Sequence, residues 1–295
     1  MEQKTIYALG FFDGVHLGHQ ALLAECRRLA EQKHCRACAV TFDYPPSAIL
    51  QNRKAAMLTS AEDRVRLLQL YGMDSVTVLR ADPQTMSMPW QAFLESLQKN
   101  GAVGFVCGTD YRFGSGGEGT ARVLEDFCRK RGLLCTVIPE QMLDGEKISS
   151  TRIRSLLEEG KPEQANRLLG HPYCMTGQVV SGQQLGRNIG FPTANLQLSQ
   201  ELLTPKLGVY AGKALVDGAE YPAVVNIGTR PTVEGNGVNL EAFLLDFDGD
   251  LYGKTLQIQL HAVLRQEKKF PSLEDLKEEI EKNVRQTRNF FGKSE

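Results

Sequence analysis

The chain has 295 residues, of which 42% are hydrophobic and 23% charged, and its formal net charge is −1. At about 150 residues per domain this length predicts two domains, and the balanced charge provides no basic field that would favour nucleic acid as a partner. No apolar run approaches the ~18 residues of a membrane span, and the first residues lack the pattern of a signal peptide. We therefore expect a cytoplasmic protein without a membrane partner.

The seven cysteines stand at positions 26, 35, 38, 107, 128, 135 and 174. Their number is odd and several fall in apolar patterns, which predicts reduced and mostly buried thiols. Cys35 and Cys38 form a lone CxxC pair, and no second pair has the spacing of a zinc site. We expect these residues to be structural.

In the first half of the chain, predicted strands alternate with predicted helices. Strands are expected at 5–12, 35–42, 74–79, 102–108 and 133–140. Helices are expected at 17–32, 59–71, 90–101 and 119–132. This alternation predicts a parallel sheet with helices on both faces. Thr59 lies three residues before Glu62, which predicts a capping box for the second helix.

Two short helices are predicted next, at 151–159 and 162–169, and Gly170 ends the second. The sequence pattern changes near 170–172, so we expect domains at 1–170 and 173–295. In the second half, Asp217-Gly218 and Asp248-Gly249 each separate apolar runs, a strong hairpin signal.

Residues 255–264 alternate between apolar and polar side chains, as in a half-buried antiparallel strand. Ser272, three residues before Asp275, caps a final helix from about 273. The second half is therefore predicted to be a small β-barrel or sandwich with a terminal helix.

Two histidines, His16 and His19, stand three residues apart at the start of the first predicted helix. This spacing places them on one helix face, where free N–H groups and the helix dipole attract anions. Gly14 and Gly18 permit a close backbone approach to a ligand. The spacing alone leaves three alternatives open: a phosphate site, half of a metal site, or two surface histidines.

A second group of polar residues opens the helix predicted at 151–159. Ser149, Ser150 and Thr151 supply three consecutive hydroxyls, and Arg152 and Arg154 follow. Hydroxyls, N–H groups and guanidinium groups at a helix start suit a phosphate clamp. A plain N-cap followed by solvated arginines is the alternative.

The segment 114–119 matches GxGxxG, and Glu140 follows 21 residues after Gly119. A dinucleotide fingerprint should begin where a strand ends, whereas five residues separate these glycines from the strand at 102–108. We therefore favour a mobile loop over a ligand.

Residues 177–196 contain a glycine-rich segment that ends in Pro-Thr-Ala-Asn. Such a loop can bring backbone N–H groups close to phosphates. Thr193 and Asn195 face the same side if the chain is extended, and their neutral oxygens suit Mg²⁺ that keeps most ligation for phosphates and water. A glycine-rich hairpin connection is the alternative.

Glu241 alternates with Phe243, Leu245 and Phe247 along a predicted strand. A carboxylate on such an apolar face can be partly desolvated and act as a general base. A glutamate at the rim of a strand, without a catalytic role, is the alternative.

Three motifs of the first half together resemble a known family. GFFDGVHLGH (10–19) resembles the HxGH signature of nucleotidylyltransferases. With GTDYRFG (108–114) and ISSTRIR (148–154), the first half resembles the FMN adenylyltransferase module of bacterial bifunctional FAD synthetases.

That resemblance implies a Rossmann-like domain in which the FMN phosphate attacks the α-phosphorus of ATP and pyrophosphate leaves. It implies that His16 and His19 hold the ATP phosphates and stabilise the transition state, and that Asp110 lies at the nucleotide–flavin junction. The other residues implied at the ATP site are Gly10, Phe11, Asp13, Gly14, Ser149, Ser150, Thr151, Arg152 and Arg154.

The second half is similar to riboflavin kinase, an antiparallel β-barrel with a terminal helix. GRNIGFPTAN (186–195), GVYAG (208–212), NIGTRPT (226–232) and DLYG (250–253) occur in the family's order. The resemblance implies that Thr193 and Asn195 hold Mg-ATP and that Glu241 deprotonates the terminal ribityl hydroxyl. It also implies phosphate binding by Gly182, Gly186, Gly190 and Pro192, and flavin binding by Asn226, Arg230 and Arg265, the last in a flap.

The whole chain is thus expected to convert riboflavin and ATP to FMN and ADP, and FMN and ATP to FAD and pyrophosphate. Mg²⁺ is the implied cofactor, and flavin-using apoproteins are possible recipients of the products. Three segments depart from the family: FDYPP at 42–46 lacks a histidine, 81–90 lacks phenylalanines, and Phe243 replaces a histidine. The alternatives are a riboflavin kinase with a degenerate adenylyltransferase domain and a non-catalytic flavin-binding regulator.

Overall fold

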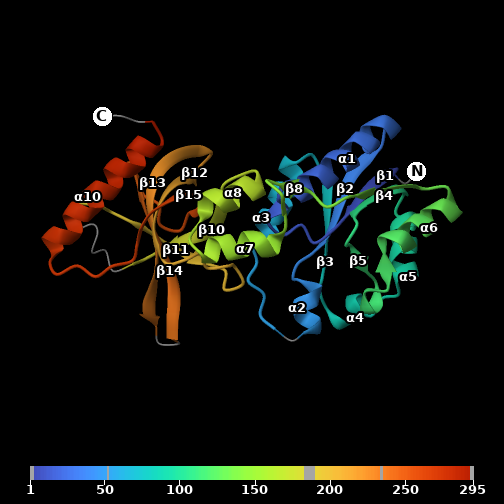
Figure 1. Ribbon diagram of the computed structural model, residues 1–295, viewed down its shortest axis with the longest axis horizontal. Coiled ribbons are helices and arrows are strands. Elements are labelled where there is room, and N and C mark those ends of the chain that lie inside the picture. The colour runs from blue at the N-terminus through green and yellow to red at the C-terminus, as the bar shows by residue number, and fades with distance from the viewer. Residues whose placement is uncertain (1–2, 52, 183–189, 233–234, 293–295) are drawn as a thin grey trace. The chain divides into compact units, whose positions relative to one another are not determined.

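The computed structural model describes residues 3–51, 53–182, 190–232 and 235–292, except for the side chains of 230–238 (Figure 1). Contacts divide the chain into two units, the first with residues 1–55 and 59–150, the second with 56–58 and 151–295. The helices expected after residue 150 therefore pack with the second unit. The functional boundary at 170–173 stays a prediction.

Five parallel strands form the central sheet of the first unit, in the order β3-β2-β1-β4-β7. The strands are β1 (Thr5–Leu9), β2 (Arg36–Phe42), β3 (Ser75–Leu79), β4 (Ala102–Gly108) and β7 (Leu134–Ile138). The helices are α1 (Leu17–Lys33), α2 (Pro46–Leu50), α3 (Ala61–Leu70), α4 (Pro83–Met86), α5 (Trp90–Lys99) and α6 (Ala121–Arg131). The predicted parallel α/β domain is confirmed.

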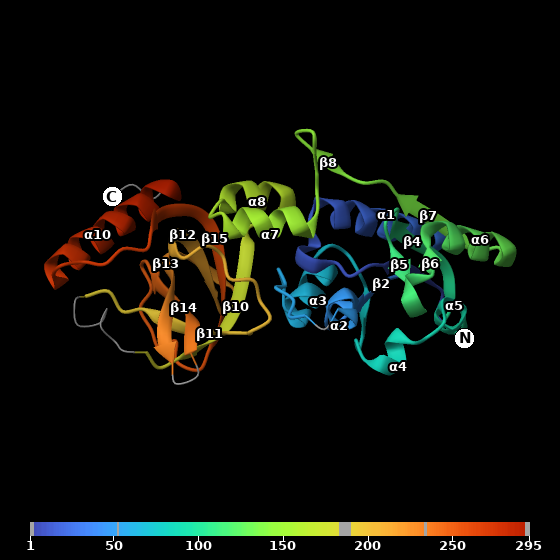
Figure 2. The same cartoon turned by 60° about the horizontal axis from the view of Figure 1, so that its bottom comes forward.

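Both faces of the sheet are buried at the central strands β1, β2 and β4, as their apolar residues predict. Ile6 and Ala8 of β1 pack in one core with α1 and α3. Tyr7 and Leu9, the alternate residues, pack in a second core with α5 and α6. Because successive side chains of a strand point to opposite faces, β1 joins both cores. The small β8–β9 hairpin (Met142–Leu143 and Glu146–Lys147) projects from this unit (Figure 2).

The strand order reverses between β1 and β4, which is the topological switch point where ligands bind in open α/β sheets. The histidine segment follows β1 and Asp110 follows β4. Because the strands are parallel, both segments leave the same edge of the sheet.

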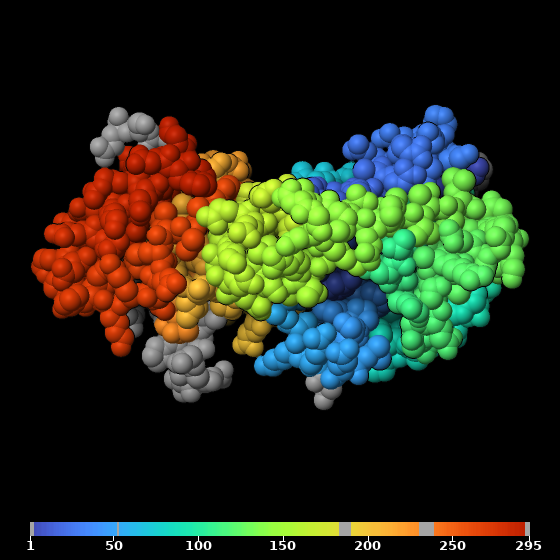
Figure 3. Space-filling view, in the orientation of Figure 1, coloured from blue at the N-terminus to red at the C-terminus, as the bar shows by residue number. Residues whose placement is uncertain are grey.

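Six antiparallel strands of the second unit form a closed barrel in the order β10-β11-β14-β13-β12-β15. They are β10 (Tyr173–Val180), β11 (Ala194–Leu198), β12 (Gly208–Val216), β13 (Ala219–Thr232), β14 (Gly235–Leu244) and β15 (Thr255–Gln266). The helices are α7 (Ser150–Glu158), α8 (Pro162–Leu169) and α10 (Leu273–Phe290). Figure 3 shows α10 on the surface of this unit. None of the helices in the described ranges has the length and apolarity needed to cross a membrane.

One hairpin prediction is confirmed and the other is wrong. Val216 pairs with Ala219 across Asp217-Gly218, and both turn residues have positive φ, at 51° and 86°. Asp248-Gly249 does not make a hairpin, because β14 pairs with β11 and β13 whereas β15 pairs with β10 and β12. The local turn chemistry is outweighed there by the strand order of the barrel.

The caps follow the sequence with one correction. Ser272 caps α10 and its hydroxyl accepts the Asp275 N–H, as predicted. For α3 the cap is Ser60, which accepts the Asp63 N–H at 3.0 Å, so the predicted capping box at Thr59 is displaced by one residue. Thr59 is left to bind a different partner.

Candidate active sites

The loop after β1 makes a tight turn that presents the two histidines. Phe12, Gly14 and Val15 have φ values of 59°, 78° and 40°. A Cβ on Gly10 would stand 2.8 Å from the Phe12 ring, so a larger residue would displace that ring. The chain then enters α1 with His16 as its N-cap.

His16 and His19 lie against each other at this helix start. Their rings stack with centroids 3.6 Å apart and planes 13° apart. The His19 backbone N–H donates to His16 Nδ1 at 3.3 Å. Because Nδ1 accepts this bond, a neutral His16 carries its ring proton on Nε2.

Burial, His16 and Arg64 together hold the pKa of His19 well below its usual value, in that order of importance. His19 is therefore a neutral imidazole at pH 7. Its Nδ1 is buried and has no hydrogen-bond partner among the described residues. Phe12 meets the His19 ring edge-on at 5.3 Å.

Asp13 is buried and holds the loop together. Its carboxylate accepts the Thr59 backbone N–H at 3.0 Å and the Thr59 hydroxyl at 3.1 Å. The Gly14 N–H donates to the same hydroxyl at 3.2 Å. The Ser150 hydroxyl donates to the Asp13 carbonyl at 2.9 Å, so the structure brings the first hydroxyl of α7 to the histidine loop.

On the other side of the switch point, Asp110 follows β4 and its side chain is 75% exposed. Lys147 Nζ lies 3.8 Å from its carboxylate and also pairs with Glu140. Gly108 is tightly placed, since a Cβ there would stand 3.2 Å from Asp110 Oδ1.

The segment after β2 that departs from the family is held by hydrogen bonds of Asp43 and Tyr44. Asp43 Oδ1 accepts the N–H groups of Tyr44 and Ala81, at 2.7 and 2.8 Å. The Tyr44 hydroxyl accepts the Ala55 N–H at 2.8 Å. Tyr44 thus fixes the chain after α2.

Of the remaining residues of the α7 motif, Thr151, Arg152 and Arg154 lie in the second unit, whereas Ser149 lies in the first. Arg154 Nε donates to the Ala56 carbonyl at 2.7 Å, and Arg152 lies 4.0 Å from Glu159. Their implied role in ATP binding, with Thr151 and Ser149, stays a prediction.

The glycine-rich segment 114–119 connects two short strands, β5 (Arg112–Phe113) and β6 (Gly119–Thr120). It does not follow β4 directly, so it is not placed as a dinucleotide fingerprint. Gly114 is required for packing, because a Cβ there would lie 2.7 Å from the Trp90 backbone.

In the barrel, four predicted site residues stand in one row across neighbouring strands. Asn195 of β11 is opposite Glu241 of β14, and Glu241 is opposite Asn226 of β13. Asn226 is in turn opposite Val209 of β12, and Val209 is opposite Arg265 of β15. Directly opposed residues share a face, so this row brings together residues up to 70 positions apart.

The row faces the outside of the barrel. Leu240 and Ala242, on either side of Glu241, are fully buried in the core, whereas Glu241 is half-buried. The Asn239 side-chain amide donates to Glu241 Oε1 at 2.7 Å. Glu241 is therefore oriented by a neighbour two residues before it on the same face.

Asn195 is 5% exposed and is closely surrounded. A Cβ on Gly182 would stand 2.3 Å from its amide nitrogen, so only glycine fits at 182 without moving Asn195. Thr193 is half-buried and Pro192 is exposed just before β11. Gly190 has φ 90°, Gly186 lies outside the described residues, and so does the side chain of Arg230.

A pocket of about 620 Å³ lies beside Thr193. Its lining includes Phe243, Phe247, Asp248, Asp250 and Tyr252. Phe191 meets the Phe243 ring edge-on at 5.3 Å. Phe243, where the family often has histidine, thus forms part of an apolar wall two residues from Glu241.

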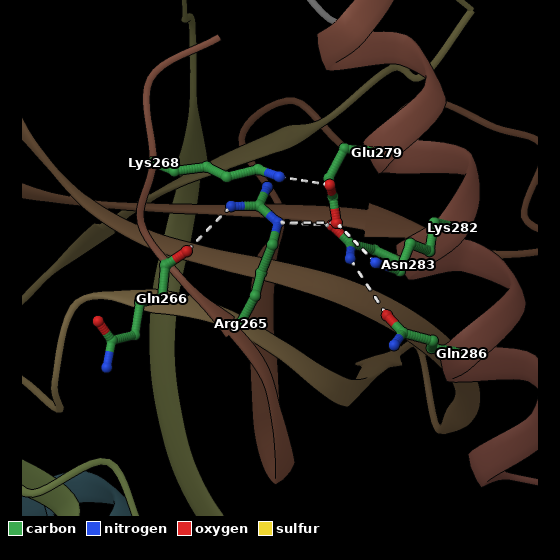
Figure 4. Close-up of polar contacts among 7 residues, drawn as sticks. All are labelled: Arg265, Gln266, Lys268, Glu279, Lys282, Asn283 and Gln286. Atoms are coloured by element: carbon green, nitrogen blue, oxygen red, sulfur yellow. Dashed lines mark hydrogen bonds and ion pairs between the residues drawn. The ribbon is translucent and has the colours of Figure 1, made fainter.

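At the other end of the row, Arg265 reaches α10 (Figure 4). Its Nε donates to Asn283 Oδ1 at 3.1 Å, and Nη1 donates to the Gln266 carbonyl at 3.2 Å. Glu279 lies 3.9 Å from Arg265 and also binds Lys268 at 2.5 Å. The helix therefore contacts two residues of 264–270, the segment implied to form a flap.

Sequence reasoning missed Arg64 and Asn239, and it assigned Thr59 to a helix cap although Thr59 binds Asp13. Thr59 stands next to the true cap Ser60, and either hydroxyl satisfies the capping pattern. The sequence does contain a signal for Arg64, because this charged residue stands on an otherwise apolar helix face. Leu67, Leu68 and Tyr71 follow it at helical spacing on that face. Within the described ranges, no group of three or more His, Cys, Asp or Glu could hold a metal ion.

Comparison with known families agrees with this two-part organisation. A family model described as FAD synthetase matches residues 1–152, and one described as riboflavin kinase matches residues 169–291. The fold and the two family matches thus define a transferase with one nucleotidyl-transfer and one phosphoryl-transfer module.

Curated bifunctional riboflavin kinase/FMN adenylyltransferases align over nearly the whole chain. The protein of Listeria monocytogenes is 38% identical over 296 residues, which cover 99% of this chain and 94% of that protein. The Bacillus subtilis protein is 35% identical, with 98% and 93% covered, and the Escherichia coli K12 protein is 38% identical, with 99% and 94% covered.

A crystal structure described as a macrolide-efflux protein from Streptococcus pneumoniae superposes with a TM-score of 0.88 at 30% identity, covering 98% of this chain and 95% of that one. The chain belongs to the bifunctional riboflavin kinase/FMN adenylyltransferases. It makes FMN from riboflavin and FAD from FMN, and the predicted function is confirmed.

Proposed function

We propose that the histidine pair binds the ATP phosphates for FMN adenylylation. His16 is a neutral donor through Nε2, because its Nδ1 accepts the His19 N–H. His19 is also neutral at pH 7, since its pKa is lowered by burial. Neutral N–H donors at a helix start can stabilise phosphate oxygens without repelling each other.

The FMN phosphate needs little activation, because a phosphate monoester is largely dianionic at pH 7. Its oxygen attacks the α-phosphorus of ATP, and the bond to pyrophosphate breaks. Most of the rate then comes from alignment and from stabilisation of the charged transition state. We assign alignment of the donors to the Asp13–Thr59 hydrogen bonds and to Ser150. Asp110, exposed across the switch point, is assigned to the flavin side.

In the barrel, the row of Asn195, Glu241 and Asn226 is the observation that supports the kinase assignment. We assign Glu241 as the base that takes the proton from the ribityl terminal hydroxyl, whose oxygen then attacks the γ-phosphorus of ATP while ADP leaves. We place the nucleotide in the pocket beside Thr193. Asn226 and Arg265 lie farther along the row and are assigned to riboflavin.

The residues around Asn195 fit Mg²⁺. The amide of Asn195 and the hydroxyl of Thr193 are neutral oxygen donors, which suit a cation that keeps phosphates and waters as its other ligands. Gly182 leaves the amide in place where any Cβ would displace it. When bound, Mg²⁺ neutralises charge on the phosphates during transfer.

All seven cysteines are free thiols, which supports a reducing compartment such as the cytoplasm. Flavin-using apoproteins are the proposed recipients of FMN and FAD.

The assignment is tested with purified protein, riboflavin and ATP, with and without Mg²⁺, by chromatography of the flavins. We expect FMN and then FAD in the presence of Mg²⁺, and neither after chelation. Formation of FMN at an unchanged rate in excess chelator would contradict the metal assignment at Thr193 and Asn195.

A further inference from the structure

Arg64 of α3 is fully buried, although arginine is rarely fully buried unless it is paired. Its Nη2 donates to the carbonyls of Phe42 and Asp43, at 2.5 and 3.2 Å. Its guanidinium carbon lies 4.3 Å from the centre of the Phe11 ring. One side chain thus contacts both the end of β2 and Phe11, in the loop after β1.

Two further nitrogens of Arg64, Nε and Nη1, are buried and have no hydrogen-bond partner among the described residues. Burial of such groups is unfavourable, and burial also lowers the pKa of Arg64, against the opposing effect of Asp13 and Asp43. A guanidinium remains charged under these conditions. Stability alone therefore does not explain a buried cation at this point.

We propose that Arg64 is a positioning residue of the FMN adenylyltransferase site, which clamps the loop after β1 to the end of β2 and keeps a positive charge against the loop that carries the histidine pair. This proposal rests on the assignment of His16 and His19 to the ATP phosphates.

The clamp acts on the segment that carries the histidines. Phe11 is followed by three residues with positive φ in the next four positions, and His16 comes directly after them. A displacement of Phe11 is therefore passed to the start of α1. A guanidinium can bind two carbonyls and stack on a ring at once, whereas an ammonium has no planar surface for stacking.

The charge also contributes to the lowered pKa of His19, after burial and His16. The charged groups that act on the pKa of Arg64 itself are Asp13 and Asp43. Removal of the guanidinium leaves burial and His16 to disfavour protonation of His19, so the pKa of His19 should rise. The same removal weakens the local positive potential that attracts ATP.

Three variants test this role: R64M, which keeps the length but removes the charge, R64K, which keeps the charge but loses the planar fork, and R66M as the control. Arg66 is on the same helix, half-exposed, and pairs with Asp63 at 2.6 Å. FAD formation from FMN, FMN formation from riboflavin, and the pKa of His19 by NMR are measured in each, with H19N to assign the resonance.

In R64M we expect kcat/KM for FAD formation to fall about 100-fold, the cost of a misplacement of about 1 Å. FMN formation should be unchanged, and the pKa of His19 should rise. R64K should lose at least tenfold in FAD formation and keep the lowered His19 pKa. R66M should match the wild type in all three measurements.

The proposal is overturned if R64M forms FAD within twofold of the wild type, or if its His19 pKa does not rise. If R64M fails to fold by circular dichroism, R64K decides: a folded R64K with wild-type FAD formation overturns the clamp. Wild-type FAD formation by an H16A/H19A variant would instead overturn the phosphate assignment itself.

Discussion

Glu241 of β14 lies directly opposite Asn195 of β11 in the barrel, with the two side chains on the outer face. This pairing puts the proposed base next to the proposed magnesium ligand. Phosphoryl transfer needs the attacking oxygen and the metal-bound phosphate close together. In the proposed mechanism, the strand register supplies this alignment.

Replacement of Glu241 by glutamine should abolish proton abstraction while preserving size and the bond from Asn239. We expect E241Q to lower kcat for FMN formation about 100- to 10,000-fold, the usual contribution of a general base. FAD formation from supplied FMN should be unchanged. The matched control is E220Q, an exposed carboxylate on β13 that pairs with Lys213. Equal losses in both variants would argue against a specific role.

A Cβ at position 182 should displace the Asn195 amide, from which it would be 2.3 Å away. We expect G182A to lower the apparent Mg²⁺ affinity of the kinase about 10- to 100-fold, as for other supporting residues of metal sites. The adenylyltransferase activity of the same preparation is the internal control. A wild-type Mg²⁺ titration of the kinase would count against Asn195 as a ligand.

The two neighbouring hydroxyls of Thr59 and Ser60 should give separable effects. T59V removes one hydrogen bond from the Asp13 carboxylate and one from the Gly14 N–H, which should cost about 1–3 kcal/mol, and should lower FAD formation. T59S keeps the hydroxyl and should therefore retain both the stability and the FAD formation of the wild type. S60A removes the cap of α3, a loss of about 0.5–2 kcal/mol, with kcat for FAD formation unchanged. Equal kinetic losses in T59V and S60A would contradict a special role for Thr59.

The stability of the protein should fall as the pH is lowered from about 6.5. The pKa of His19 is lowered in the folded state, chiefly by burial, whereas the unfolded chain binds a proton with its ordinary pKa near 6.5. Below that pH the unfolded state gains protons that the folded state does not, so the free energy of unfolding decreases by up to about 1.4 kcal/mol per pH unit. Denaturant unfolding between pH 7.5 and 5.5 measures this slope.

The matched variant for the pH slope is H19N, which removes the titrating group. It should flatten the dependence between pH 6.5 and 5.5. His261 in the barrel also has a lowered pKa, through burial and Lys213, so H261N should remove a separate part of the slope. An H19N slope as steep as that of the wild type would show that His19 is not held neutral in the folded state.

The sequence predicts what depends on local pattern. The alternation of strands and helices, the Ser272 cap and the placement of His16 and His19 at a helix start follow from periodicity, capping and turn residues. The pairing of Asn195, Glu241 and Asn226 could not be predicted in this way, because it depends on which strands of the barrel are neighbours.

The corrections have the same origin. Asp248-Gly249 has the chemistry of a tight turn, but the strands on either side of it are not neighbours in the barrel. Thr59 and Ser60 are both suitable caps, and only the packing of Asp13 determines which of them is used. Arg64 is recognisable afterwards as a charge on an apolar stripe, but its partners Phe42 and Phe11 lie on other elements.

The central claim, two independent active sites on one chain, is tested most directly by mixing two variants that each lack one of the two activities. Alone, E241Q should make FAD from FMN but not from riboflavin, and H16A/H19A should convert riboflavin to FMN and stop there. A mixture of the two should make FAD from riboflavin, because FMN released by one variant is adenylylated by the other. Failure of the mixture, although each folded variant keeps its one activity, or loss of both activities from either folded variant, would contradict the account.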